Sequence, residues 1–187
     1  MLQDPGRTKA VLPDKKLADG AVLTVLGLGS NRGDSIHGDP PNILRGAIRA
    51  LEAVLEDLKT AGMLESEPLH VTDQSRFFNT AVSGFYWGEA LELLDSIHKI
   101  EASFGRDRSR EQRWGERTLD IDILLFGDQI ISRPPLLEIP HPRLRERCFA
   151  LVPLLELLPN AIDPLTGISY QSILDGLPDQ GIYYPAP

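Results

Sequence analysis

The chain has 187 residues, of which 42% are hydrophobic and 25% charged, values typical of one globular domain. Its formal net charge of −8 argues against a general nucleic-acid-binding protein, because such proteins usually carry a basic surface. No apolar run approaches the roughly 20 residues that cross a bilayer, and residues 1–20 lack the apolar core of a signal peptide. The single cysteine, Cys148, excludes an internal disulfide and suits a reducing compartment, so we expect a cytoplasmic protein.

Positive charge is concentrated in one part of this acidic chain. Arginine outnumbers lysine 14 to 5, and nine of the arginines fall between Arg106 and Arg147. A locally positive pocket in an acidic protein suits a small anionic ligand better than a long polyanion. We therefore expect a small-molecule ligand, with no nucleic acid, no membrane and no obligatory protein partner.

The first sixty residues predict an extension, a strand and a helix. Residues 1–20 are polar and lack periodicity, so we expect a flexible extension before a single domain at 21–187. The short apolar stretch 21–28 predicts a buried strand. Asp39 before two prolines predicts a helix start, and leucines at helical spacing extend this helix to about Lys59.

The remaining chain alternates strand-like and helix-like stretches. The expected strands are 63–71, 77–87, 118–126 and, after a tight turn, a short partner strand at 129–132; the expected helices are 89–104, 149–158 and 170–177. Gly105 provides the end of the helix at 89–104. The core order strand, helix, strand, strand, helix, strand predicts an α+β ferredoxin-like βαββαβ sandwich, with an antiparallel sheet and helices packed on one face.

The segment 105–127, GRDRSREQRWGERTLDIDILLFG, places five arginines before Asp120 and Asp122. Side chains alternate along a strand, so both carboxylates project from the same side. Neighbouring carboxylates repel one another unless a cation lies between them, and Mg²⁺ prefers carboxylate and phosphate oxygens. Arginine forks match phosphate, so the segment predicts a site for a Mg²⁺-bound polyphosphate. The alternative is a solvated strand face beside a solvated arginine loop.

Several shorter patterns have both a structural and a functional interpretation. Trp114 lies in the polar arginine loop and is expected to pack against something, a ligand ring being one option. Phe77 and Asn79 share a strand face, where they could bind a flat heterocycle or could belong to the core. His141 begins a second arginine-rich run that could contact phosphate or solvent. The glycine-rich stretch 27–33 is better explained as a turn than as a dinucleotide-binding motif, because its third glycine comes one residue late.

Taken in order, these pieces resemble the 6-hydroxymethyl-7,8-dihydropterin pyrophosphokinase family of the folate pathway. The matching segments are GLGSNRGD (27–34), FFNTAV (77–82), GRDR (105–108), RWGERTLDIDILLFG (113–127) and IPHPRLRERCF (139–149). The resemblance covers roughly residues 21–160 and implies a ferredoxin-like fold. The loop between Arg108 and Arg113 is one residue longer than is common, and residues 35–41 resemble a small insertion.

The resemblance implies roles for individual residues. The implied metal ligands are Asp120 and Asp122, which with Arg106 and Arg117 form the catalytic set. The implied ATP-binding residues are His98, Glu101, Arg106, Arg108, Arg113, Trp114, Arg117, His141 and Arg147. The implied pterin-binding residues are Ser66, Leu69, Phe77, Asn79, Trp114, Asp120 and Phe149.

The resemblance also implies a reaction. The family moves the β,γ-diphosphate of ATP onto the hydroxymethyl group of the dihydropterin and releases AMP, with two Mg²⁺ ions organising the triphosphate. ATP and 6-hydroxymethyl-7,8-dihydropterin are therefore the expected substrates. Two other classes remain open on the residues alone: an RNA-binding module on the same fold, and a phosphoryl or nucleotidyl transferase that uses the same aspartate pair.

Overall fold

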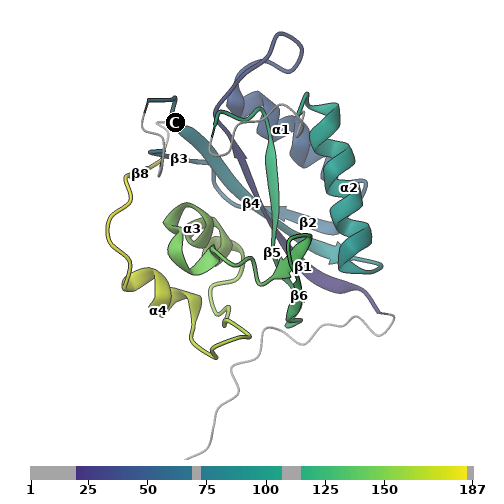
Figure 1. Ribbon diagram of the computed structural model, residues 1–187, viewed down its shortest axis with the longest axis vertical. Helices are drawn as coiled ribbons and strands as arrows, with labels where there is room; N and C mark the ends of the chain where they lie inside the picture. Colours follow the sequence, from purple (N-terminus) through teal and green to yellow (C-terminus); the bar gives the residue numbers. More distant parts are fainter. Residues whose placement is uncertain (1–19, 69–72, 107–114, 185–187) are drawn as a thin grey trace, which may run out of the picture.

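The computed structural model describes residues 20–68, 73–106 and 115–184, which form a mixed α and β structure around an antiparallel sheet (Figure 1). The main sheet consists of β1 (Val22–Ser30), β2 (Glu56–Thr60), β3 (Leu64–Ser66), β4 (Phe77–Tyr86), β5 (Asp120–Phe126) and β8 (Ile182–Tyr183). A separate two-stranded sheet consists of β6 (Ile131–Arg133) and β7 (Leu137–Ile139). The helices are α1 (Pro40–Leu51), α2 (Ala90–Ser103), α3 (Cys148–Leu157), α4 (Tyr170–Asp175) and the 3-10 helix η1 (Leu144–Glu146).

The strands of the main sheet follow the order β5-β1-β4-β3-β8. Strand β1 lies between β5 and β4 and pairs antiparallel with both. The long strand β4 has two partners on its other edge: β2 pairs with its C-terminal half and β3 with its N-terminal half. Side chains on β5, β1 and β4 therefore form continuous rows across the centre of the sheet.

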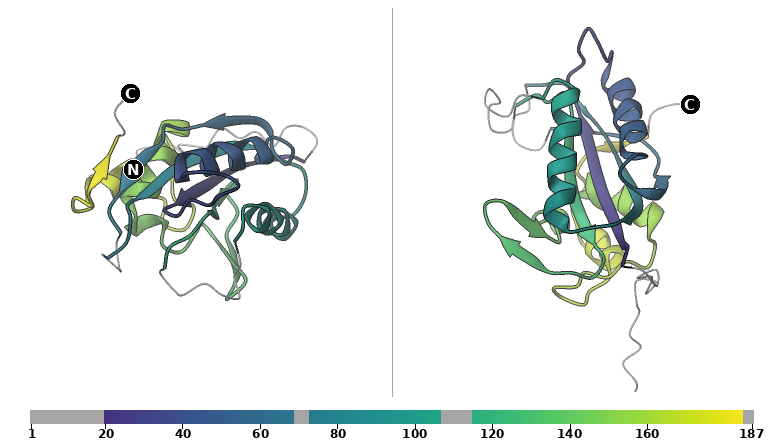
Figure 2. Two further views of the ribbon diagram at one scale, coloured as in Figure 1. Left: turned by 90° about the horizontal axis from the view of Figure 1, so that it is seen from above. Right: turned by 90° about the vertical axis from the view of Figure 1, so that its right-hand side faces the viewer.

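Each face of the sheet is covered by helices. Helices α1 and α2 cover one face, which receives Leu26 and Leu28 of β1, whereas Val25 projects to the other face and packs in the cluster that contains α3 (Figure 2). The expectation that the helices lie on one face is therefore correct for α1 and α2 and wrong for α3. The sequence of α3, CFALVPLLEL, is apolar on nearly all sides, and such a helix needs partners all round.

Helix α1 begins as predicted and ends early. The Asp39 side chain accepts a hydrogen bond from the Asn42 amide at 2.9 Å, which caps the first turn. The helix ends at Leu51, whereas leucine spacing predicted a longer one. Leu55 lies in the following turn and Leu58 in β2, yet both pack on the same core as the helix. The helical spacing of these leucines therefore indicates that they pack in one core, but it does not show that one helix carries them all.

After β4, the predicted helices and the strand β5 are present, whereas β7 and β8 were not predicted and β6 has a different partner. Helix α2 begins with a capping box between Glu89 and Glu92 and is followed by Gly105, as expected. The short strand after the Gly127 turn pairs with β7 and not with β5, which corrects the expected hairpin. Leu137 of β7 is buried in the main hydrophobic core, so the hairpin formed by β6 and β7 packs against that core. No helix in the described part of the chain is both long and apolar enough to cross a bilayer.

Candidate active site

Two glycines of β1 form the floor of a pocket on the face of the sheet that α3 covers. The strand register places Gly29 opposite both Asn79 and Asp120, and Gly27 opposite Asp122. A Cβ atom at Gly29 would lie 3.3 Å from Asn79 Oδ1, so a side chain there would crowd the floor. The pocket also receives other residues expected at a ligand site: Ser66, Phe77, Arg117, His141, Arg147 and Phe149.

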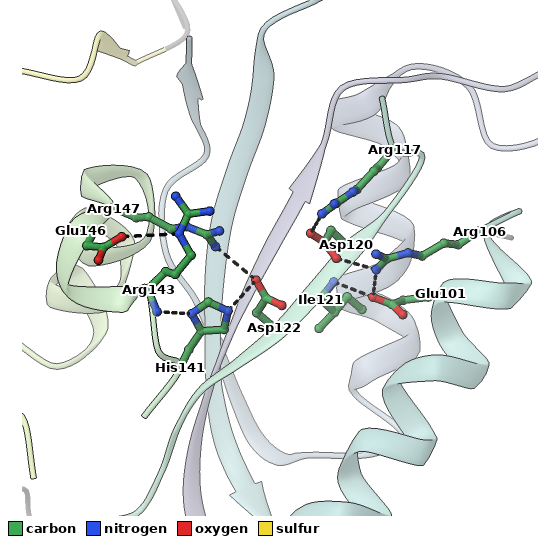
Figure 3. Close-up of polar contacts among 10 residues, drawn as sticks. All are labelled: Glu101, Arg106, Arg117, Asp120, Ile121, Asp122, His141, Arg143, Glu146 and Arg147. Carbon is green, nitrogen blue, oxygen red and sulfur yellow. Dashed lines mark hydrogen bonds and ion pairs between the residues drawn. The ribbon is translucent and has the colours of Figure 1, made fainter. Parts of the chain in front are cut away.

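Asp120 is held by two arginines from outside its own strand. Arg106 Nη1 donates a hydrogen bond to Asp120 Oδ1 at 2.5 Å, and Arg117 Nη1 donates to Asp120 Oδ2 (Figure 3). Burial alone would raise the pKa of the Asp120 carboxyl. The charges of the two guanidinium groups outweigh burial and hold this pKa below its ordinary value, so Asp120 is ionised at neutral pH.

The Asp122 carboxylate meets the second basic cluster at longer range. Its Oδ2 lies 3.6 Å from His141 Nε2 and 3.7 Å from Arg147 Nη1, and its side chain is 37% exposed against 23% for Asp120. Desolvation in the pocket and repulsion from Asp120 together raise the pKa of Asp122. The ionised form of Asp122 is therefore disfavoured, and a cation bound beside the two carboxylates would oppose that effect.

His141 presents one ring nitrogen to the aspartate pair. Its Nδ1 accepts a hydrogen bond from the Arg143 amide at 3.2 Å, so the ring proton resides on Nε2, which faces Asp122 (Figure 3). Burial lowers the pKa of His141, and the charge of Asp122 opposes that shift. The histidine thus directs an N–H group into the pocket while remaining uncharged at neutral pH.

Two arginines carry buried donors that suit an anion. Arg117 Nε and Arg147 Nε are buried and have no hydrogen-bond partner among the described residues. Buried donors of this kind are rare in proteins unless a ligand, ion or water completes them. Both residues line the pocket, on opposite sides of the aspartate pair (Figure 3). This arrangement fits a polyphosphate that spans from one arginine to the other.

The pocket is also lined by an amide side chain and two aromatic rings. Asn79 Nδ2 donates to Ser66 Oγ at 2.9 Å and to the Phe77 carbonyl at 3.3 Å. These two hydrogen bonds leave Asn79 Oδ1 facing the floor at Gly29. Phe77 and Phe149 line the same cavity. An acceptor beside aromatic rings suits the N–H edge of a flat heterocycle.

Asn31 is a site residue that the sequence interpretation missed. It is 3% exposed, and its Oδ1 accepts a hydrogen bond from the Arg117 amide at 2.8 Å. The amides of Asn31 and Arg32 in turn both donate to the Arg117 carbonyl at 3.1 Å. Asn31 therefore fixes the backbone of a pocket arginine. Its position in the stretch SNRGD, at the end of a strand, was the available signal; that stretch was interpreted as a turn and as part of the family resemblance, with no role given to Asn31.

Some expected site residues lie away from the pocket. His98 is half-buried on α2, which packs on the opposite face of the sheet. Glu101 is 1% exposed; it accepts a hydrogen bond from Arg106 Nη1 and another from the Ile121 amide at 2.8 Å (Figure 3). In this structure Glu101 positions Arg106 and does not line the pocket. Contact of either residue with ATP stays a prediction.

The three arginines of the segment 141–147 contact different parts of the structure. Arg147 reaches the pocket, whereas Arg145 Nε lies 3.3 Å from Asp163, and Arg143 Nε lies 3.5 Å from Glu146. Four expected site residues, Leu69, Arg108, Arg113 and Trp114, lie outside the described residues, as does the predicted extension up to residue 19. Within the described ranges, no three His, Cys, Asp or Glu side chains group as a complete metal site.

Comparison with proteins of known sequence gives a consistent result. The family model for 7,8-dihydro-6-hydroxymethylpterin-pyrophosphokinase matches residues 25–159. The chain is 42% identical over 140 residues to the 2-amino-4-hydroxy-6-hydroxymethyldihydropteridine pyrophosphokinase of Aquifex aeolicus, covering 75% of this chain and 82% of that protein. It is 39% identical over 137 residues to the Bacillus subtilis protein of the same name, covering 72% of this chain and 77% of that one.

Larger proteins are similar to this chain over part of their length. A mitochondrial folate synthesis bifunctional protein of Arabidopsis thaliana is 39% identical over 150 residues, which cover 80% of this chain and 26% of that protein. The crystal structure of wild-type HPPK-DHPS from Plasmodium falciparum superimposes with a TM-score of 0.64 at 16% identity, covering 83% of this chain and 44% of that one. The family match and the single-function relatives carry the assignment: the chain belongs to the 7,8-dihydro-6-hydroxymethylpterin-pyrophosphokinase family.

Proposed function

We propose that the pocket between β5, β1, β4 and α3 is where this chain transfers the β,γ-diphosphate of ATP to the hydroxymethyl group of 6-hydroxymethyl-7,8-dihydropterin, releasing AMP. One observation carries the proposal: a pair of carboxylates flanked by arginines shares one cavity with an amide and two phenylalanine side chains. The first part suits a polyphosphate and the second a pterin. The floor glycines leave space for the two substrates to meet.

A ferredoxin-like arrangement is also proposed. The strand order β5-β1-β4, followed by β2 and β3 side by side on the far edge of β4, supports it. In this interpretation β2 and β3 together occupy the position of one edge strand. The α3 helix and β8 are additions on the second face and at the edge.

The residues present fit two magnesium ions held at Asp120 and Asp122. Both side chains project from the same face of β5, as their positions one residue apart require, and both line the pocket. Two protein carboxylates suffice for Mg²⁺, which usually takes its other ligands from substrate phosphates and water. When bound, the ions screen phosphate charge and align nucleophile and leaving group. The unequal pKa shifts of the two carboxyls support the assignment, because Arg147, 3.7 Å from Asp122, is farther away than Arg106, which lies 2.5 Å from Asp120.

The arginines are proposed to hold the transferred group. Arg117 and Arg147 flank the carboxylate pair with buried Nε donors that have no partner among the residues the structure describes, and Arg106 shares Asp120 with Arg117. Charge that develops on the diphosphate during transfer would be met by these preorganised donors. Arginine in such a position can contribute about 10³-fold or more in rate. Arg108, Arg113 and Trp114 are proposed to complete the ATP site.

The pterin is proposed to lie between Phe77 and Phe149 with its polar edge toward Asn79. The Ser66 and Phe77 hydrogen bonds lock the Asn79 amide, so its orientation is set before the ligand arrives. Preorganisation of this kind lowers the entropy lost on binding. In this pose the hydroxymethyl group is proposed to lie along the row Asn79, Gly29, Asp120, which leads from the amide to the aspartate pair.

Product analysis tests the proposal directly. The purified chain, supplied with Mg²⁺, ATP and 6-hydroxymethyl-7,8-dihydropterin, is expected to form AMP and the pterin diphosphate in equal amounts. Formation of ADP would instead indicate a simple kinase, and binding without turnover would indicate a non-catalytic module. Asp122→Ala is expected to abolish AMP formation while circular dichroism shows an unchanged fold. Full activity in that variant contradicts the metal assignment.

A further inference from the structure

The segment 178–183 connects the two walls of the pterin end of the pocket. After α4 the chain returns to the sheet and ends in β8, which lies beside β3 at the edge of the molecule (Figure 1). On its way it passes the N-terminus of α3. This segment, called the strap below, lies beyond the part of the chain that matches the family model, residues 25–159.

The first strap contact is made by Gln180. Its Oε1 accepts a hydrogen bond from the Cys148 amide at 2.9 Å, and its Nε2 donates to the Glu146 carbonyl at 2.8 Å. The residue between these two is Arg147, so one side-chain amide holds the backbone on both sides of a pocket arginine. Arg147 makes no side-chain cap for α3, and Gln180 satisfies a first-turn amide in its place.

This contact determines where the start of α3 lies. Phe149 is the second residue of α3, and the Arg147 guanidinium lies over its ring at 5.5 Å from the centroid. The Cys148 thiol also approaches the Pro178 carbonyl at 3.8 Å. Both Arg147 and Phe149 line the pocket. The strap therefore fixes the helix turn from which one pocket wall projects.

The second strap contact is with the opposite wall. Strand β8 pairs with β3 through Ser66↔Ile182, and the Glu67 amide donates to the Gly181 carbonyl at 3.2 Å. Ser66 is the residue whose hydroxyl accepts from Asn79. Gly181 has a φ of 63°, and a Cβ atom there would lie 2.9 Å from the Glu67 side chain. The strap can approach this wall because position 181 is glycine.

A stacked pair of side chains, Arg76 and Tyr183, also holds the strap against the sheet. The Arg76 guanidinium lies over the Tyr183 ring at 4.5 Å from the centroid and pairs with Glu67 at 2.8 Å. Arg76 directly precedes Phe77, a lining residue of the pocket. The stack therefore joins the strap to the start of β4 as well as to β3.

We propose that the strap sets the separation of the two pterin-binding walls, with Gln180 as the positioning residue that places Phe149 relative to Ser66. This inference rests on the proposed pterin pocket. Gln180 contacts backbone groups of α3 and η1, and it acts on the ligand through the position of Phe149. Loss of the Gln180 contacts widens the distribution of wall separations and weakens pterin binding, while the aspartate pair stays in place on β5.

The test compares Gln180→Met with the wild type by steady-state kinetics. Methionine keeps the approximate volume and removes both polar contacts. The KM for the dihydropterin is expected to rise about fivefold, the size of one neutral hydrogen bond, because only part of the loss of the two contacts reaches the ligand through Phe149. The KM for ATP is expected to rise less, because Arg147 lies between the two Gln180 contacts whereas Arg117 and the aspartate pair do not. Partial unfolding would lower the maximal rate without changing KM, so a purely structural role predicts a different result. An unchanged pterin KM overturns the proposal.

Two further variants control the experiment. Gln171→Met removes an exposed side-chain hydrogen bond within α4, from Gln171 Nε2 to Asp175, and is expected to leave both KM values unchanged. Gln180→Glu keeps the acceptor for the Cys148 amide and is expected to recover part of the pterin affinity, since a carboxylate at a helix N-terminus is also favourable. Failure of Gln180→Glu to improve on Gln180→Met counts against the capping contact.

Phe149→Ala separates failure of the strap from failure of the pocket. If Phe149→Ala leaves the pterin KM unchanged, the pocket assignment itself is wrong. If Phe149→Ala raises it and Gln180→Met does not, the strap proposal alone is wrong. In the double variant, the Gln180 substitution is expected to add no further increase, because the ring through which it acts is absent. Fully additive effects contradict a route through Phe149.

Discussion

Asn79 and Asp120 face the same pocket from strands on either side of β1, with Gly29 directly between them. Two strand spacings of about 4.8 Å place the two residues about 10 Å apart across the floor. One end of the row suits a pterin and the other suits phosphate and metal. The glycine determines whether one continuous cavity joins them.

Gly29→Val is expected to block that junction. Its first side-chain atom would already lie 3.3 Å from Asn79 Oδ1, and the added methyl groups would occupy the floor. We expect kcat/KM for the dihydropterin to fall by about tenfold or more, since single methyl groups in a pocket can discriminate to that extent. Valine suits a strand, so the fold should persist. Gly176→Ala, where a Cβ atom meets ordinary contacts at 3.5 Å, is the matched control.

Substituting the two aspartates by asparagine is expected to abolish turnover in both cases and to change stability in opposite directions. Asp120→Asn removes the charge that holds Arg106 and Arg117 and should cost about 2 kcal/mol of unfolding free energy, the size of charge-assisted hydrogen bonds. Asp122→Asn removes a desolvated charge together with its repulsion from Asp120, and should raise the thermal midpoint of the metal-free chain. Urea or thermal unfolding measures both changes. A loss of stability in Asp122→Asn contradicts the repulsion argument.

The pH dependence of unfolding should separate the same two groups. Because the folded-state pKa of Asp120 is lowered, its contribution to stability is complete above about pH 4 and is lost as the pH falls through the folded value. The folded-state pKa of Asp122 is raised, so its cost to stability is complete above that raised value and disappears as the pH falls toward about 4. The stability advantage of Asp122→Asn should therefore shrink on acidification. An advantage that is constant with pH would show that charge is not its cause.

Glu101→Gln tests whether this buried residue acts through Arg106. Glutamine can still accept from the Ile121 amide, but it lacks the charge that draws Arg106 into place. We expect kcat to fall about tenfold or more, as for other residues that orient a ligand-binding group, with ATP affinity unchanged. Equilibrium binding of an ATP analogue measures the second quantity. A selective loss of ATP affinity would instead support the direct nucleotide contact predicted from the sequence resemblance.

Local rules predicted the elements whose determinants are local. The cap at Asp39, the capping box at Glu89 and the glycine after α2 lie within a few residues of the backbone groups they control, so the helix starts and the α2 end were correct. The α1 end was wrong because Leu55 and Leu58 pack on the helix core from a turn and a strand. Periodicity reports which residues share a core and not the conformation between them.

The site residues that were predicted correctly are also those related by short spacing in the sequence. Asp120 and Asp122 share one face of their strand, and Phe77 and Asn79 share one face of another, because side chains alternate along a strand. Asn31 was missed because its partner, Arg117, is distant in sequence and is joined to it by hydrogen bonds just beyond the paired ends of β1 and β5. The expected contact of Glu101 with nucleotide stays a prediction, and the contacts that only the packing of α2 could reveal are those of Glu101 with Arg106 and the β5 backbone.

The amino-acid sequence by itself determined the chemistry of this protein: a carboxylate pair on one strand face and a cluster of arginines, both consequences of spacing along a single segment. Only the tertiary structure decided how these groups are combined. It placed Gly29 between Asn79 and Asp120, selected Arg147 over Arg145 for the pocket, and brought Gln180 to the start of α3. Each of these relations joins residues far apart in the chain, and distances of that kind are set by the packing of the sheet and helices and not by local periodicity.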